Sequence, residues 1–168
     1  MLKKNINEFN SFFKEINDEW AIVTAGDKFV GYNAMTVSWG GIGVLWNKPV
    51  AFIFVRKSRY TLEFMNKSDS VTLSFLGDKY KKEKTLFGRT SGRDVNKFEE
   101  TGLHASFEPD FNGYFVAEAD KVLKLKKLYS TDIDFENMPE GIKNSNYANN
   151  DMHVMYVCEV KQYLVNEE

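Results

Sequence analysis

The sequence predicts a mainly β protein, an antiparallel barrel whose ends are covered by short helices. Roughly seven segments have the alternation or the apolar composition of strands, whereas only a few short segments have helical spacing. Strands and helices do not alternate in the regular order that βαβ units would give, which favours an antiparallel barrel. No repeat and no Pro/Gly/Ser-rich linker divides the chain, so we expect a single domain over residues 1–168.

The clearest strands lie in the middle and near the C-terminal end of the chain. Residues 50–55 (VAFIFV) form an unbroken apolar run between a proline and an arginine, which is typical of a buried strand. Residues 70–76 alternate strictly, and residues 152–160 form another strand that extends toward residue 165. Residues 119–129 place lysines between apolar residues, as on a strand with one face in solvent.

The N-terminal quarter predicts a helix followed by several strands. Residues 5–17 have apolar side chains at helical spacing. Strands are expected over residues 20–25, 28–33 and 35–39, with a turn at Gly26-Asp27 and a glycine-rich bend at residues 40–43.

Three further segments have the features of short helices. Residues 58–65 follow this pattern, with Ser58 as the candidate N-cap. Residues 79–88 predict a helix whose lysines face solvent. A third helix is expected around Phe98, with Asp94 as its candidate cap.

Composition and charge exclude several classes of protein. A content of 43% hydrophobic and 15% aromatic residues is too apolar for a disordered chain. A net charge of −2 argues against nucleic acid as the main partner, because phosphate-backbone binding needs a basic excess. The N-terminal segment lacks the apolar core of a signal peptide, and no apolar run approaches the length of a membrane span. We therefore expect a cytoplasmic protein without a membrane partner.

Few residues are suited to metal binding or to covalent catalysis. Cys158 is the only cysteine, so an internal disulfide and a multi-cysteine zinc site are excluded. Its strand-like surroundings favour a buried, inert thiol, with a redox or intersubunit role as the alternative. The two histidines lie far apart, and we predict no metal. The Gly-rich nucleotide loops, HExxH and GxSxG are absent; a Ser-His-Asp site stays open by residue type alone.

The first of three polar clusters runs from Asn33 to Gly41 (NAMTVSWGG). On a strand, Thr36 and Ser38 would share one face and could hydrogen-bond the polar edge of a ligand. The other face would carry Met35, Val37 and Trp39. The glycines that follow would allow a flat ring to approach the backbone. An ordinary strand followed by a loop is the alternative.

The second cluster stands where the buried strand at residues 50–55 gives way to a helix. It contains three cations and two hydroxyls: Arg56, Lys57, Ser58, Arg59 and Thr61. Guanidinium groups beside free backbone N–H groups at a helix start suit a phosphate. A solvated, charged turn is the alternative.

The third cluster is a basic, glycine-containing loop over residues 88–98. Its candidate binding residues are Ser91, Gly92, Arg93, Asp94 and Lys97. A capped helix start with solvated charges would explain the same residues.

In order and spacing, these clusters resemble the flavin reductase-like family, in particular its flavoredoxin-type branch. The similar segments are NAMTVSW (33–39), PVAFIFVRKSRYT (49–61), TSGRDVNKF (90–98) and HVMYVCEV (153–160). They span most of residues 20–165.

The resemblance implies an antiparallel, Greek-key-like FMN-binding split barrel that forms a homodimer, with FMN near the subunit interface. The segment with Asn33, Thr36, Ser38 and Trp39 would lie along the flavin ring, together with Met35 and Val37. The turn with Arg56, Lys57, Ser58, Arg59 and Thr61 would hold the phosphate. The loop with Ser91, Gly92, Arg93, Asp94 and Lys97 would complete the pocket, from the same or the facing subunit.

His153 matches a histidine that such proteins carry before their last strand, where it would lie near the flavin or the donor. A structural histidine is the alternative. His104 matches nothing in the family and is expected at the surface.

The function implied is an NAD(P)H-dependent flavin reductase or a flavoredoxin-like electron carrier, with NADH or NADPH as donor and a redox partner protein as one acceptor. Three alternatives stay open: a flavin-binding module without reductase activity, a pyridoxamine-phosphate-oxidase-like FMN enzyme, and a flavin-free barrel for a lipid or another small ligand. Two features depart from the family pattern. The glycines at 40–43 suggest a looser pocket wall, and Asn144–Asn150 is either a mobile lid or a surface loop.

Overall fold

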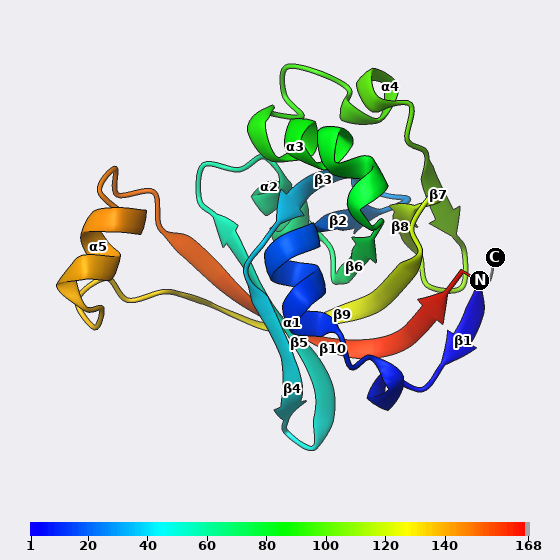
Figure 1. Ribbon diagram of the computed structural model, residues 1–168, viewed down its shortest axis with the longest axis horizontal. Coiled ribbons are helices and arrows are strands. Elements are labelled where there is room, and N and C mark those ends of the chain that lie inside the picture. The colour runs from blue at the N-terminus through cyan, green and yellow to red at the C-terminus, as the bar shows by residue number, and fades with distance from the viewer. Residues whose placement is uncertain (167–168) are drawn as a thin grey trace.

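The computed structural model describes residues 1–166; residues 167 and 168 of the expected domain lie outside the described residues. Within this part, one curved antiparallel sheet has the strand order β3-β2-β6-β9-β10-β5-β4, and β1 pairs with β10 (Figure 1). Its strands are β1 Leu2–Lys4, β2 Ala21–Asp27, β3 Gly31–Val37, β4 Gly40–Leu45, β5 Lys48–Arg56, β6 Ser70–Phe75, β9 Lys121–Asp132 and β10 His153–Val165. A separate hairpin joins β7 Ala105–Glu108 to β8 Gly113–Val116.

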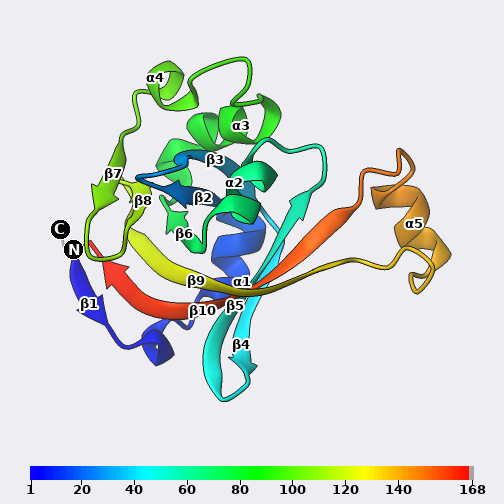
Figure 2. The ribbon, with the colours of Figure 1, turned by 180° about the vertical axis from the view of Figure 1, so that it is seen from behind.

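The α-helices are short. They are α1 Phe12–Lys14, α2 Thr61–Lys67, α3 Lys81–Arg89, α4 Lys97–Thr101 and α5 Glu140–Asn146. Helices α3 and α4 lie over one end of the sheet, whereas α5 sits on an arm that projects beside it (Figures 1 and 2). We call residues 133–152, which join β9 to β10, the β9–β10 arm. The predicted mainly antiparallel β fold with short helices is confirmed.

The strands predicted after residue 50 are all present. Strand β5 is buried at alternate positions, and β6 is buried from Val71 to Phe75. The hairpin between β2 and β3 is also confirmed. Gly26 has φ of 123°, a conformation that favours glycine, and the Asp27 carboxylate accepts hydrogen bonds from the backbone of Phe29 and Val30.

Two expectations about residues 28–43 are wrong. Residues 31–37 form one strand rather than the end of one and the start of another. The glycines at 40–43 are not a bend but the edge strand β4, which pairs with β5. A Cβ at Gly40 would lie 2.9 Å from the carbonyl oxygen of Phe52, so the glycine permits this close pairing. Contacts with β5 thus outweigh the weak strand propensity of glycine.

The helix predicted over residues 5–17 is broken into short turns. Ile6–Glu8 is a 3-10 turn, α1 has three residues, and Glu15–Glu19 continues as a π-helical turn. Phe9, Phe12 and Ile16 are buried, but Phe13 is 90% exposed. The buried side chains keep the predicted helical spacing, but residues 9–11 are not helical and interrupt the expected helix.

Two lysines expected in solvent are buried. Lys84 on α3 is fully buried and donates hydrogen bonds to the carbonyl oxygens of Glu19 and Gly77. Lys124 on β9 is 1% exposed and pairs with Glu108 of β7. Burial lowers the pKa of both amines. Glu19 and Glu108 lie 65 and 16 residues away from these lysines, and a local charge pattern does not reveal such partners.

Neither predicted helix cap is present. Helix α2 begins at Thr61, three residues later than expected, so Ser58 does not cap it. Helix α4 begins at Lys97 and is preceded by Asn96, so Asp94 is not its N-cap.

Apolar side chains pack on both faces of the sheet. One cluster includes Val23, Ile53, Met65 and Tyr156, and the other includes Ile22, Phe87 and Leu164. Cys158 lies in the first cluster as a free, fully buried thiol, and burial raises its pKa to about 12. Within residues 1–166, none of the helices has the length and hydropathy needed to cross a bilayer.

Candidate functional site

Three cavities in the described part of the chain lie in a row between the sheet and helices α2, α3 and α4. The first has a volume of about 250 Å³, the second about 90 Å³ and the third about 440 Å³. Arg59 lines both the first and the second cavity. Asn33, Tyr60, Gly92 and Lys97 line both the second and the third. The second cavity therefore adjoins the other two.

The first cavity is built on the end of β3. It is lined by Met35, Thr36, Val37, Ser38, Trp39, Phe54, Arg56, Arg59, Gly88 and His153. Because β3 ends at Val37, Trp39 does not continue the strand face of Met35 and Val37. Trp39 is 45% exposed, and its ring lies 5.3 Å from that of His153. The predicted grouping of Trp39 with the two buried side chains is therefore wrong.

The two hydroxyls of this segment are in different situations. Thr36 Oγ1 donates a hydrogen bond to the carbonyl oxygen of Lys84 at 2.5 Å, which ties β3 to α3. A Cβ at Gly88 would lie 3.4 Å from Thr36, so α3 packs closely on β3 here. Ser38 follows the end of the strand and lines the cavity without a side-chain hydrogen bond to residues 1–166.

The second cavity brings hydroxyls and cations together. Ser58, Arg59 and Thr61 come from the turn after β5, and Thr90, Ser91 and Gly92 come from the loop after α3. Asn33 Nδ2 donates to Thr61 Oγ1 at 2.8 Å. A Cβ at Gly92 would lie 2.1 Å from Asn33 Oδ1, so glycine lets the loop close this wall. The volume is several times the ~10–15 Å³ that a water needs, so a phosphate-sized group has room.

Two cations at the second cavity share one acceptor. The carbonyl oxygen of Phe87 accepts hydrogen bonds from Lys97 Nζ at 3.0 Å and from Arg59 Nη2 at 3.4 Å. Lys97 also donates to the carbonyl oxygen of Ala34 at 3.0 Å, and Arg59 donates to that of Gly88. Lys97 is 5% exposed, and burial together with the nearby Arg59 lowers its pKa to about 8. Burial also lowers the pKa of Arg59.

These hydrogen bonds leave donors free. An ammonium has three N–H donors and a guanidinium has five, more than the carbonyl oxygens use. Two like charges held this close repel each other, and an anion beside them would relieve the repulsion.

The third cavity has aromatic and polar walls. Its rings belong to Tyr32, Tyr60, Phe64, Phe87 and Phe98, and its polar residues include Arg93, Asp94 and Asn96. Arg93 pairs with Glu63 at 2.6 Å, and its guanidinium lies 4.6 Å from the centre of the Tyr60 ring.

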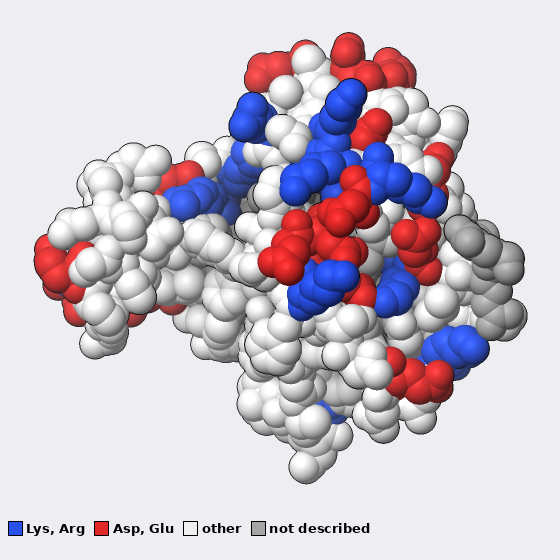
Figure 3. Space-filling view, viewed as in Figure 1, with Lys and Arg blue, Asp and Glu red and all other residues white. Residues whose placement is uncertain are grey.

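The β9–β10 arm is attached to the turn after β5. Arg56 donates to the carbonyl oxygens of Asp151 at 2.7 Å and Asn146 at 3.1 Å. The Asp151 carboxylate accepts from the backbone N–H and the hydroxyl of Ser58. Figure 3 shows basic side chains in the recess between the arm and the rest of the molecule. The predicted Asn144–Asn150 segment is thus not a plain surface loop, because it contains the end of α5 and the buried Tyr147.

His153 is held between the arm and the first cavity. Its Nδ1 lies 2.8 Å from the hydroxyl of Tyr147, and it is 6% exposed. Burial, with a smaller contribution from the charge of Arg56, lowers its pKa to about 4. The imidazole is therefore neutral near pH 7, with one nitrogen bound to Tyr147.

Comparison of the chain with known proteins supports this architecture. A family model for the flavin reductase like domain matches residues 13–168. The chain belongs to the flavin reductase-like family. No curated protein matches the chain.

Solved structures of the flavin reductase-like type share the fold. Flavoredoxin of Desulfovibrio vulgaris (Miyazaki F) is 20% identical with a TM-score of 0.68, over 88% of this chain and 69% of that one. Flavoredoxin from Methanosarcina acetivorans is 18% identical with a TM-score of 0.66, over 99% of this chain and 76% of that one. A protein with a split barrel domain from Shewanella frigidimarina NCIMB 400 is 16% identical with a TM-score of 0.70. The match covers 98% of this chain and 76% of that one. The predicted split-barrel fold and family resemblance are confirmed.

The predicted site residues of this flavin reductase-like chain fall into four groups. Met35, Thr36, Val37, Ser38, Trp39, Arg56 and His153 line the first cavity, with Arg59 at its border. Asn33, Ser58, Thr61, Ser91, Gly92 and Lys97 line the second. Arg93 and Asp94 lie only at the third. Lys57 lines none of these cavities, because its amine pairs with Asp132 on β9 at 2.6 Å.

Several lining residues were not predicted. Phe54 and Gly88 line the first cavity, Tyr60 and Thr90 the second, and Tyr147 supports His153. Tyr60, Gly88 and Thr90 stand inside the polar clusters, so their position in sequence was a usable signal. Phe54 and Tyr147 reach the site only through the sheet and the arm, which no local motif indicates. His104 is exposed as expected and pairs with Glu118.

We predict that His153 makes the folded protein less stable in mild acid. Its pKa of about 4 lies below the ordinary value of 6.5, so the folded state binds this proton less well than the unfolded state. The associated stability is complete above pH 6.5 and declines as the pH falls toward 4, by up to about 3 kcal/mol. Urea unfolding at pH 7 and pH 4.5 should therefore show a smaller loss for His153→Gln than for wild type.

His104→Gln is the matched control, since it removes an exposed histidine elsewhere. Equal losses of stability in the wild type and His153→Gln would show that His153 is not held neutral.

Proposed function

We propose that the chain binds FMN and acts as a flavin-dependent oxidoreductase. The observation that carries the proposal is the Arg59–Lys97 pair, which lies beside a cavity whose described lining contains no carboxylate. A phosphate monoester carries close to two negative charges near pH 7 and has acceptor oxygens for both cations and for the hydroxyls of Thr61 and Ser91. Membership of the flavin reductase-like family supports a flavin as the molecule that bears this phosphate.

The first cavity supports a ring system next to that phosphate. Its walls combine apolar side chains, among them Val37, Phe54 and Trp39, with the polar or charged side chains of Thr36, Ser38, Arg56, Arg59 and His153. The apolar side chains could contact the faces of a ring, and the polar groups could hydrogen-bond its edge. Arg59 lines both cavities, so a ring and a phosphate of one molecule would lie on its two sides. The donor set and the two adjoining volumes therefore fit FMN.

The protein residues in this proposal bind and orient the cofactor. When bound, FMN would supply the hydride and electron transfer. Arg56, held by carbonyl oxygens of the β9–β10 arm, keeps a positive charge at the first cavity, where it would favour negative charge. The neutral His153 would offer a hydrogen bond without adding a further positive charge to those of Arg56 and Arg59. No protein nucleophile is required.

NADH or NADPH is the proposed electron donor. The family supports this choice, and the opening of the first cavity beside the half-exposed Trp39 leaves a face on which a donor could approach. A flavin-binding module without reductase activity would have the same FMN site. Only the reduction of bound FMN by a nicotinamide distinguishes it from a reductase.

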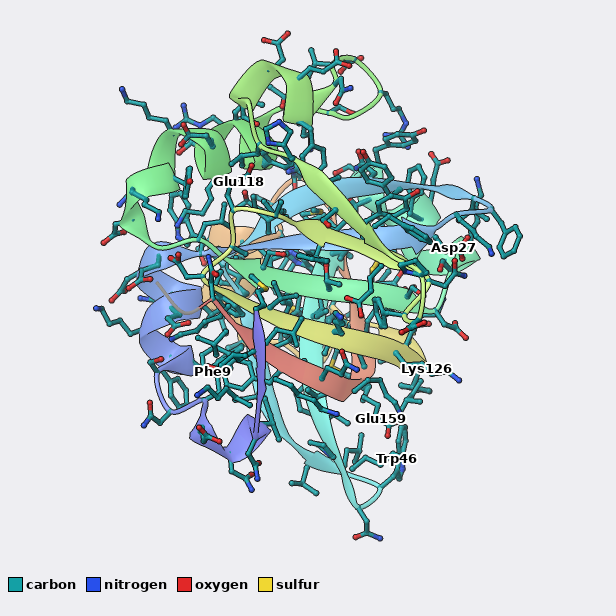
Figure 4. The ribbon with its side chains drawn as sticks, turned by 90° about the vertical axis from the view of Figure 1, so that its right-hand side faces the viewer. Phe9, Asp27, Trp46, Glu118, Lys126 and Glu159 are labelled. Carbon is teal, nitrogen blue, oxygen red and sulfur yellow. The ribbon has the colours of Figure 1, made fainter. Side chains whose placement is uncertain are left out.

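We also propose that the chain forms a homodimer. Strand β4 is an edge of the sheet, and large apolar side chains are exposed on it and nearby: Trp39, Val44, Trp46, Leu128 and Tyr129. The rings of Trp46 and Tyr129 lie 6.2 Å apart, so they belong to one surface. Figure 4 shows Trp46 at the tip of the β4–β5 hairpin, where a second subunit could reach it. Exposed apolar surface of this kind supports an interface.

FMN affinity should depend on Arg59. Arg59→Ala removes a charged donor from the second cavity and should weaken FMN binding by about 1.5–3 kcal/mol, or roughly 10- to 150-fold. Lys57→Ala is the control, since that cation faces Asp132, and it should bind FMN like wild type. Fluorescence quenching of FMN measures both. Wild-type protein that does not quench FMN, or equal affinity in Arg59→Ala, would refute this site.

Reduction of the bound flavin by a nicotinamide tests the enzyme class. Without oxygen, NADH or NADPH should bleach the visible absorption of the FMN complex much faster than that of free FMN. The readout is a stopped-flow absorption trace, with free FMN as control. If the protein binds FMN but the bound FMN is bleached no faster than free FMN, the chain is a flavin-binding module and not a reductase.

Charge on the exposed apolar surface should weaken the dimer. Trp46→Asp places a carboxylate at the tip of the β4–β5 hairpin and should shift the protein toward monomer in sedimentation velocity. Phe29→Asp, at an exposed position in the β2–β3 turn, is the control and should sediment like wild type. A wild-type protein that is monomeric at all concentrations would contradict the proposed homodimer.

A further inference from the structure

One buried hydrogen bond joins the β9–β10 arm to the first cavity. Tyr147 follows α5 in the arm, and its hydroxyl lies 2.8 Å from Nδ1 of His153, the first residue of β10. Both side chains are buried. The hydroxyl has no second hydrogen-bond partner within residues 1–166, and neither has Nδ1. Each of the two groups therefore depends on the other.

The direction of this hydrogen bond decides which nitrogen of His153 carries the proton. His153 is neutral near pH 7, because burial and the charge of Arg56 lower its pKa to about 4, and a neutral imidazole has one donor and one acceptor nitrogen. If Nδ1–H donated to Tyr147, the phenol hydrogen would be buried without an acceptor among the described residues. If Tyr147 donates to Nδ1, both groups are satisfied and the proton is on Nε2. The second arrangement is favoured, because a buried, unpaired donor is costly.

The Nε2 atom is the part of His153 that a molecule in the first cavity can reach. It has no hydrogen-bond partner within residues 1–166, and it is not one of the fully buried polar atoms that lack a partner. His153 lines the first cavity, and its ring lies 5.3 Å from that of the half-exposed Trp39. An Nε2–H donor at this place suits an acceptor such as a carbonyl oxygen on the edge of a ring.

Other contacts fix the Tyr147 ring independently of its hydroxyl. The guanidinium of Arg56 lies 5.4 Å from the centre of this ring. Arg56 also donates to the carbonyl oxygens of Asn146 and Asp151, which precede and follow Tyr147 in the arm. His153 pairs with Arg56 where β10 meets β5, at the base of the arm (Figure 2). Removal of the hydroxyl alone should therefore leave the ring and the arm in place.

We propose that Tyr147 is a positioning residue that fixes the Nε2–H tautomer of His153, so that His153 donates a hydrogen bond to a carbonyl oxygen of the ring bound in the first cavity. The inference rests on the proposed function, because it takes the first cavity as the site of a flavin ring. Tyr147 does not line this cavity and acts through His153. It lies in the segment Asn144–Asn150, to which the family resemblance gives no role.

NMR of the ligand-free, full-length chain with ¹⁵N-labelled histidine tests the tautomer. In two-bond proton–nitrogen correlation spectra near pH 7, wild-type His153 should be almost wholly in the Nε2–H form. His104→Gln assigns the signals, because the chain has only two histidines. In Tyr147→Phe, which keeps the ring and removes the hydroxyl, the ratio of the Nε2–H to the Nδ1–H form should fall about fivefold or more. The wild-type spectrum decides the tautomer even if this variant does not fold.

Tyr156→Phe is the matched control for the loss of a buried hydroxyl. The Tyr156 hydroxyl donates a hydrogen bond of the same length, 2.8 Å, to Asn66, and Tyr156 packs in the core. This variant should leave the tautomer of His153 as in wild type.

Addition of FMN tests the donor role of His153. In wild type, FMN should move the Nε2–H proton signal of His153 to lower field and slow its exchange with water, because a hydrogen bond to the ligand does both. In Tyr147→Phe, FMN should raise the share of the Nε2–H form, because a ligand shifts a population toward the form that it binds.

The outcomes separate the inference from the proposed function. An Nδ1–H tautomer in the ligand-free wild type, or an unchanged tautomer ratio in Tyr147→Phe, would overturn the positioning role. FMN that binds without shifting the Nε2–H proton would overturn the donor role and leave FMN binding intact. Failure of FMN to bind would overturn the proposed function and with it the donor role, while the spectra of the ligand-free protein would still decide the role of Tyr147.

Discussion

The candidate site depends on one carbonyl oxygen. Phe87 O accepts from both Arg59 and Lys97, and these cations come from the turn after β5 and from the start of α4. Lys97 also donates to Ala34 on β3, so the sheet, α3, α4 and the turn meet at one point. Two positive charges are costly to bury without a counterion. The surrounding core, with the fully buried Phe87 ring, holds them there. The proposed phosphate would supply the missing counterion.

The charged side chains on the two sides of the Phe87 carbonyl oxygen have different kinds of partners. On the side of the first cavity, Arg56 is committed to carbonyl oxygens of the β9–β10 arm, and His153 is kept neutral by burial. On the side of the third cavity, Arg93 is paired with Glu63. At the second cavity, Arg59 and Lys97 are hydrogen-bonded to carbonyl oxygens and have no paired carboxylate in the described part of the chain. The arm, which looks peripheral in Figures 1 and 2, is therefore connected to the site through Arg56 and Asp151.

Much of this site is local in the sequence, which is why three polar clusters revealed it. Arg59 and Thr61 lie in one cluster and Ser91 and Lys97 in another, and the fold needed only to bring the two together. What could not be predicted depends on distant partners. Arg56 and Lys57 are adjacent and both positively charged. Lys57 pairs with Asp132, whereas Arg56 donates to the β9–β10 arm. The burial of Lys84 depends in part on the distant Glu19. Strand β4 forms because its glycine-rich segment pairs with β5.

The lone thiol has a practical consequence. Only a thiolate reacts readily with maleimides or disulfide reagents, and a pKa of about 12 leaves about one thiol in ten thousand ionised at pH 8. Cys158 also lies in the middle of the core, out of reach of such reagents. A cysteine introduced anywhere on the surface would thus be modified alone, without first mutating the native one. Spin labels or fluorophores on the β9–β10 arm could then report distances to the barrel in an otherwise unaltered protein.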